Sequence, residues 1–84
     1  MNYYEKNYIY RIRKIANKLL LMNTKECFEI NEITKDIFDF LDEKRNKEEI
    51  LEHLKESYSD INEEEIMTFL SKLIEKGIIE ICQE

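Results

Sequence analysis

The order of residue patterns along the chain predicts an α+β fold in which three N-terminal antiparallel β-strands pack on three α-helices. Three observations lead to this prediction. Residues 8–30 contain three short stretches of β-forming and aliphatic side chains. Residues 31–77 carry apolar side chains three and four positions apart, which is typical of helices that bury one face. Each helical stretch also opens with an asparagine, a preferred N-cap residue.

Three short stretches are expected to form the strands. In residues 8–15, Tyr8, Tyr10 and Ile12 alternate with Ile9, Arg11 and Arg13, and residues 18–22 are almost entirely aliphatic. Both compositions favour strands. The next four residues form a hairpin turn, because the first of them, Asn23, tolerates a left-handed conformation. The third strand spans Cys27–Ile30, with alternate side chains on opposite faces. Residues 1–7 have no clear period and are expected to form a flexible arm.

The three expected helices share one pattern, an asparagine cap followed by an apolar stripe. The asparagine side chain accepts a hydrogen bond from a backbone N–H group that has no partner within the helix. A glutamate follows the second and third asparagines by three residues, which is the spacing of a capping box. The caps are Asn31, Asn46 and Asn62. The stripes are Ile33, Ile37, Phe40 and Leu41, then Ile50, Leu51, Leu54 and Tyr58, and finally Ile66, Phe69, Leu70 and Leu73.

The end of the third helix is marked by Gly77, the only glycine in the chain. A residue just past a helix C-terminus often takes a left-handed conformation, which glycine adopts without strain. Ile78 is placed to close back onto Leu73. Residues 78–81 are expected to add a short strand or to pack as an extended cover.

Length and charge indicate one domain over residues 1–84, with a net charge of −6. Residues 1–25 hold six basic side chains and one acidic one, whereas residues 26–84 hold seven basic and eighteen acidic side chains. An acidic body is repelled by phosphate, so nucleic-acid binding is not expected. The longest aliphatic run, Leu19–Met22, is too short for a membrane span or a signal peptide. A cytoplasmic location without a membrane partner is therefore expected.

The residues suggest no catalytic, metal or cofactor site. Cys27 and Cys82 are far apart in sequence, and His53 is the single histidine, so neither a disulfide framework nor a zinc site is indicated. The glutamates of residues 48–56 recur on the solvent face of a helix, where charges serve solvation. One glycine cannot build a phosphate-binding loop. The sequence therefore predicts a protein that is not an enzyme and needs no cofactor.

Several motifs within residues 17–79 share their order and spacing with a known family. Ile30-Asn31 stand where that family has Leu-Asn at the end of a strand, and Asn46 stands at its threonine cap. Residues 65–77 follow its last motif, Asp-Val-x-x-Phe-Leu-x-x-Leu-x-x-x-Gly. Glu43 departs from the pattern, because the family has a glycine there. The chain resembles the PqqD-like family, small recognition domains for ribosomally made, post-translationally modified peptides.

This resemblance implies a winged-helix-like fold and a non-catalytic function as a RiPP recognition element. Such a domain binds the leader segment of a precursor peptide and delivers it to a modifying enzyme, such as a radical S-adenosylmethionine maturase or a leader peptidase. The leader would add as a further strand to the edge of residues 27–30. An edge strand offers unpaired N–H and C=O groups, so the backbone supplies affinity that tolerates many sequences.

The specificity pockets are expected between the third strand and the third helix. The candidate residues are Glu26, Cys27, Phe28, Glu29 and Ile30 on the strand, and Met67, Leu70, Ser71 and Ile74 on the helix. Phe28, Ile30 and Leu70 are equally compatible with ordinary core positions, whereas Met67 suits an adaptable apolar groove. Glu26 and Glu29 predict a leader with Lys or Arg near its anchors, and hence binding that weakens with salt.

Two other functions stay open at this point. A winged-helix DNA-binding or regulatory module would share the fold, although its third helix would carry Glu63, Glu64 and Glu65 into the groove of DNA. An interaction domain that self-pairs through its exposed edge would use the same surface as a peptide receptor. The oligomeric state expected is a monomer or a weak homodimer.

Overall fold

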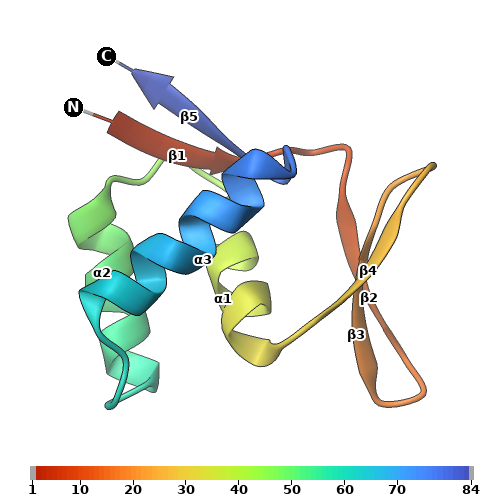
Figure 1. The fold of residues 1–84 in the computed structure, drawn as a ribbon, viewed down its shortest axis with the longest axis horizontal. Coiled ribbons are helices and arrows are strands. Elements are labelled where there is room, and N and C mark those ends of the chain that lie inside the picture. The colour runs from red at the N-terminus through yellow and green to blue at the C-terminus, as the bar shows by residue number, and fades with distance from the viewer. Residues whose placement is uncertain (1, 84) are drawn as a thin grey trace.

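The computed structural model describes residues 2–83 and confirms the α+β class, with antiparallel strands followed by three helices (Figure 1). A further strand follows the third helix. The elements are β1 Asn2–Lys6, β2 Arg11–Ile15, β3 Lys18–Met22, β4 Cys27–Ile30, α1 Glu32–Phe40, α2 Lys47–Ser57, α3 Glu63–Glu75 and β5 Ile79–Gln83.

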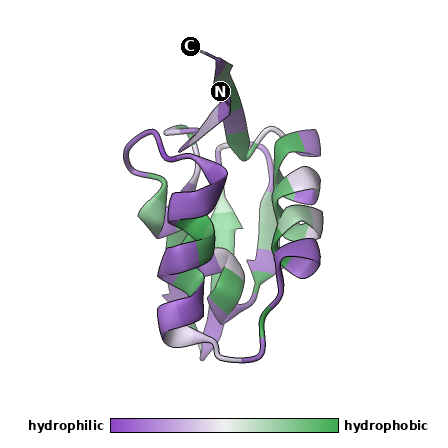
Figure 2. Ribbon diagram, turned by 90° about the vertical axis from the view of Figure 1, so that its left-hand side faces the viewer, coloured by the Kyte–Doolittle hydropathy of each residue, from purple (hydrophilic) through white to green (hydrophobic). Residues whose placement is uncertain are grey.

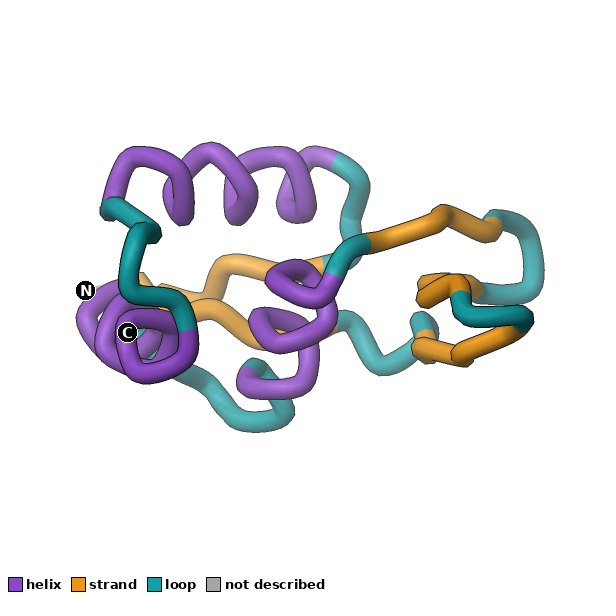
Figure 3. The backbone as a smooth tube through the Cα atoms, turned by 90° about the horizontal axis from the view of Figure 1, so that it is seen from below, coloured by secondary structure: helices purple, strands orange, loops and turns teal. Residues whose placement is uncertain are grey.

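The strands form two separate antiparallel sheets. One has three strands in the order β2-β3-β4, and the other pairs β1 with β5. Figures 1 and 3 show the three-stranded sheet at one end of the molecule, with helices on only one side of it. Apolar and polar residues alternate around the helices, as expected where a helix buries a single face (Figure 2).

The β1–β5 sheet corrects the expectation of a flexible arm at residues 1–7. Residues 2–6 pair with residues 79–83, and Tyr4 is buried in the core. Tyr4 also exchanges two backbone hydrogen bonds with Arg45, with N···O distances of 2.7 and 3.0 Å. The partner strand lies at the far end of the chain, so no local period could reveal it. The first predicted strand is shorter than expected, because residues 7–10 form a turn and β2 begins only at Arg11.

Two turns connect the strands of the three-stranded sheet. Ala16 and Asn17 both have positive φ, 51° and 66°, which identifies a two-residue turn of type I′ between β2 and β3. The turn before β4 does not have the predicted backbone conformation, because Asn23 is not left-handed. Its side-chain Oδ1 instead accepts hydrogen bonds from the N–H groups of Lys25 (2.8 Å) and Glu26 (2.7 Å).

The three asparagine caps are confirmed. In each case the side-chain oxygen accepts a hydrogen bond from the backbone N–H group three residues later. Asn46 and Glu49 form a complete capping box. At Asn62, the carboxylate of Glu65 accepts instead from the side-chain Nδ2 of the cap (3.1 Å).

The core draws on all three helices and on the strands that face them. Leu21, Ile37, Leu41, Ile50, Leu54, Ile66, Leu70, Ile78 and Ile79 are fully buried. Figure 2 shows how the apolar positions of the helices and strands meet in the interior. Ile78 and Ile79 follow α3 directly, so the end of that helix is fixed to the core.

Gly77 ends α3 as the sequence predicts, with φ of 77°. Ile78 N–H donates to the carbonyl of Leu73 (2.9 Å) and Gly77 N–H to that of Ile74 (3.0 Å), which together make a Schellman motif.

Replacing Gly77 with alanine should lower the free energy of unfolding by about 1 to 2 kcal/mol, the cost of a left-handed backbone at an L-residue. A Cβ atom there would meet nothing within 4 Å, so steric overlap adds nothing. Urea unfolding measures the loss. Gly77→Asn should cost less, because asparagine tolerates this conformation better; an alanine variant as stable as the parent would contradict the prediction.

Candidate functional site

β4 forms one edge of the three-stranded sheet. Its four residues pair with β3 on one side, from Cys27 opposite Met22 to Ile30 opposite Leu19. Within residues 2–83, no strand pairs with its other side. An unpaired edge presents backbone N–H and C=O groups that another extended chain can use.

The type I′ turn determines which residues of β3 direct their backbone N–H and C=O groups toward β2 and which direct them toward β4. Ile15 and Lys18 flank this two-residue turn and form a hydrogen-bonded pair. Bonded and non-bonded pairs alternate along antiparallel strands. β3 therefore directs the backbone groups of Leu19 and Leu21 at β4.

The same alternation divides β4. Ile30 and Phe28 lie opposite Leu19 and Leu21, so their backbone groups are used within the sheet. The N–H and C=O groups of Cys27 and Glu29 consequently face the open edge. The side chains follow the predicted faces, since Phe28 and Ile30 are half-buried against the core whereas Cys27 and Glu29 are exposed.

A groove of about 310 Å³ lies between β4 and α3. β4 contributes Phe28, Glu29 and Ile30, and α3 with its C-cap residue contributes Phe69, Lys72, Leu73 and Lys76. Asn31, Thr34 and Ile78 complete the lining. The groove therefore runs directly beside the open backbone groups of β4.

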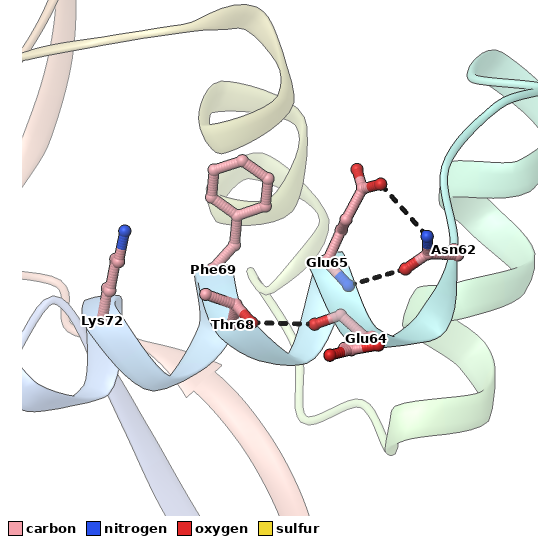
Figure 4. Close-up of a pocket in the computed structure, with 6 residues that line it drawn as sticks. All are labelled: Asn62, Glu64, Glu65, Thr68, Phe69 and Lys72. Carbon is pink, nitrogen blue, oxygen red and sulfur yellow. Dashed lines mark hydrogen bonds between the residues drawn. The ribbon is translucent and has the colours of Figure 1, made fainter.

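One flank of α3 supplies the wall of this groove. Glu65, Phe69, Lys72 and Lys76 are spaced four, three and four residues apart, so they share one side of the helix. Figure 4 shows Glu65, Phe69 and Lys72 pointing to the same side. The Nζ atom of Lys76 lies 4.7 Å from the ring centroid of Phe28, a cation–π contact that joins α3 to β4.

A second hollow of about 450 Å³ adjoins the groove at the N-terminal end of α3 (Figure 4). It shares Phe69 and Lys72 with the groove, and its other lining residues include Glu64 and Glu65. The two hollows together follow most of the length of α3.

Some of the strand residues predicted to bind the peptide line the groove, and others do not. Phe28, Glu29 and Ile30 line the groove, whereas Cys27 does not. The carboxylate of Glu26 accepts a hydrogen bond from the hydroxyl of Tyr10 (3.1 Å). Burial and this hydrogen bond both raise the pKa of Tyr10. Glu26 therefore joins the turn before β4 to the residue that precedes β2.

The predicted helix residues do not line the groove. Leu70 is fully buried in the core. Met67 lines a different hollow, beside Tyr4 of β1 and the start of α2. Ser71 is exposed and Ile74 half-buried on the same flank as Met67. The residues that sequence reasoning missed are Phe69, Lys72, Leu73 and Lys76, on the opposite flank.

The described residues provide no metal-binding cluster, and the histidine packs against an aromatic ring. Within residues 2–83, no group of three or more His, Cys, Asp or Glu side chains is placed to hold a metal ion. His53 stacks on Phe40 with ring centroids 4.0 Å apart. None of the helices in this part of the chain is long and apolar enough to cross a membrane.

An open sheet edge beside an apolar groove is the arrangement found in domains that bind extended peptides by strand addition. The family model described as coenzyme PQQ synthesis protein D (PqqD) matches residues 18–79, and the chain belongs to this family. PqqD domains are non-catalytic domains that bind precursors of ribosomally made, modified peptides and partner enzymes. Neither the curated proteins nor the solved structures gave a match to the chain.

The match runs from the start of β3 to the first residue of β5. It therefore includes both walls of the groove. β1, β2 and most of β5 lie outside it.

Proposed function

We propose that the chain binds the leader segment of a ribosomally made precursor peptide, which adds as an extended strand to the open edge of β4. The observation that carries this proposal is the position of the outward backbone groups of Cys27 and Glu29 beside the groove of about 310 Å³. The edge supplies hydrogen bonds that tolerate many sequences, and the groove supplies contacts that select side chains.

The energetics require both parts of the site. Two outward residues offer about four backbone hydrogen bonds, each worth about 1 kcal/mol net. Association itself costs about 4 to 15 kcal/mol in translational and rotational freedom, so these bonds alone do not hold a peptide. Each apolar side chain buried in the groove adds about 1.5 to 3 kcal/mol, so the apolar anchors must supply the rest of the affinity.

The alternation of strand side chains defines the peptide's contacts. Every second side chain of an added strand points to the same face. These side chains would enter the groove and meet Phe28 and Ile30 from β4 and Phe69 and Leu73 from α3. The chemistry on the precursor is then left to a partner enzyme, with a radical S-adenosylmethionine maturase or a leader peptidase as the expected classes.

The DNA-binding alternative is less well supported by the described surface. Glu63, Glu64 and Glu65 are all exposed at the N-terminus of α3. Carboxylates at the end of a recognition helix would be repelled by the phosphates that flank the DNA groove. A gel shift at low salt tests this alternative directly, and dilution-dependent sedimentation tests self-pairing through β4.

The test of the proposal is amide hydrogen exchange with a bound peptide. Peptides are first selected with the whole chain from a randomised twelve-residue phage library. Binding should then slow exchange at Cys27 and Glu29, whose N–H groups face the edge. Phe28 and Ile30 serve as internal controls, because their N–H groups already bond to β3. Failure to select any peptide above an immobilised control, or protection elsewhere on the protein only, would refute the proposal.

A further inference from the structure

Two lysines that have no carboxylate partner among residues 2–83 border the groove. Lys72 and Lys76 both line it. Within residues 2–83, neither forms an ion pair, in contrast to Lys35, Lys47 and Lys18. Their ammonium groups are donors only. Glu29, the acidic side chain of the lining, lies 3.9 Å from Lys18 of β3. Although the chain carries a net charge of −6, the two lysines therefore make this part of the groove suited to an anionic group of a ligand.

The other end of the same flank is acidic. Glu64 and Glu65 line the adjoining hollow at the N-terminal end of α3 (Figure 4). Glu65 uses one carboxylate oxygen to accept from Asn62, at 3.1 Å. Glu63 differs from both, because it forms an ion pair with Lys47 at 2.8 Å. Glu64 and Glu65 consequently favour a cationic group at this end.

The direction of an added strand follows from the sheet. β4 and α3 run in opposite directions (Figure 1), and Lys76, just after α3, contacts Phe28 near the start of β4. Both pairings in the sheet are antiparallel, and an antiparallel addition continues that pattern. A peptide added in this way runs parallel to α3. Its N-terminal side lies toward Glu65 and its C-terminal side toward Lys76.

The spacing of the charges on α3 sets their spacing in the peptide. Glu65 and Lys76 are 76 − 65 = 11 positions apart, which is about 16 Å along a helix. An extended strand covers that distance in about five residues. Glu65 and Lys72 are 72 − 65 = 7 positions apart, which corresponds to about three residues of strand.

We infer that the groove selects peptides with a fixed order of charge. A Lys or Arg lies on the N-terminal side of the apolar anchors, and an Asp or Glu follows about three to five residues later. This inference rests on the proposed function and adds the direction and charge order of the ligand. It also replaces Glu26 and Glu29 as the source of charge selection, because Glu26 is bonded to Tyr10 and Glu29 lies 3.9 Å from Lys18.

The experiment uses the same phage selection, followed by matched synthetic peptides. Selected peptides should carry the basic residue first and the acidic residue about three to five positions later. A synthetic peptide with these two residues exchanged should bind about three- to tenfold more weakly at low salt, the range expected for two exposed ion pairs. The difference should shrink at about 1 M salt, where exposed charges are screened.

Two charge-reversal variants test whether the preference for one charge order arises at the groove. Lys72→Glu should remove the preference between the two synthetic peptides. Lys55→Glu makes the same change of charge on α2, outside the groove, and should keep the preference. If peptides are selected but both charge orders bind equally, or the reversed order binds better, the inference is wrong while the proposed function stands. If no peptide is selected above the control, the proposed function fails as well.

Discussion

Replacing Glu29 with proline should weaken binding of a selected peptide by at least about tenfold while the protein stays folded. The N–H group of Glu29 faces the open edge, so its loss removes a bond to the peptide, worth about three- to tenfold in affinity, and none to β3. The proline ring also occupies space where the peptide backbone would lie. Proline is tolerated on edge strands for the same reason. Fluorescence anisotropy measures the affinity, and urea unfolding checks the fold.

Two neighbouring variants serve as controls for this prediction. Glu29→Ala keeps the N–H group and should bind nearly as well as the parent, because the carboxylate points toward Lys18. Ile30→Pro removes a bond within the sheet and a half-buried side chain, and should lower the free energy of unfolding by about 2 to 4 kcal/mol. The opposite result, a folded Ile30→Pro and an unfolded Glu29→Pro, would mean that the alternation along β4 is shifted by one residue.

The parts of the fold that the sequence predicted correctly are those set by local chemistry. The asparagine caps and Gly77 act within one helical turn, so their spacing alone identifies them. The faces of β4 follow from the period of two in Phe28 and Ile30. The pairing of β1 with β5 was missed because it joins the two ends of the chain, and neither strand has a local partner that marks it.

The flank of α3 that lines the groove differs from the predicted one, for a different reason. The buried stripe of α3, which includes Ile66 and Leu70, has a flank on each side. Helical spacing identifies both flanks but does not say which one faces β4. The flank with Met67 is more apolar than the one with Lys72, which made it the natural choice from sequence. In the structure, Met67 instead lies beside β1 and α2, an arrangement that depends on the unpredicted β1 strand.

Net charge predicts a different ligand from the one that the groove lining suggests. Residues 26–84 are strongly acidic, which suggested a basic ligand near β4. Most acidic side chains lie outside the groove lining, which holds Glu29 together with Lys72 and Lys76. The sign of charge within a few ångströms of a ligand is set by individual positions on α3, and composition averages over them.

Replacing Leu70 with alanine should lower the stability of the protein without changing its affinity for a peptide. Leu70 is fully buried, so the change should lower the free energy of unfolding by about 2 to 5 kcal/mol. This is a large fraction of the about 5 to 15 kcal/mol typical of a small domain. Under conditions where the variant remains folded, its affinity for a selected peptide should be unchanged, because Leu70 does not line the groove. Urea unfolding and anisotropy measure the two quantities.

Phe69→Ala is the matched variant, one residue away on the groove flank. Phe69 is only half-buried and lines both hollows along α3, so its loss should reduce stability less than Leu70→Ala and affinity more. Burial of one aromatic anchor is worth about 1.5 to 3 kcal/mol, or about ten- to 150-fold in affinity. Met67→Ala and Ile74→Ala test the other flank, and should leave affinity nearly unchanged. Loss of affinity in these two variants, with Phe69→Ala still binding, would place the peptide on the flank beside β1 and not beside β4.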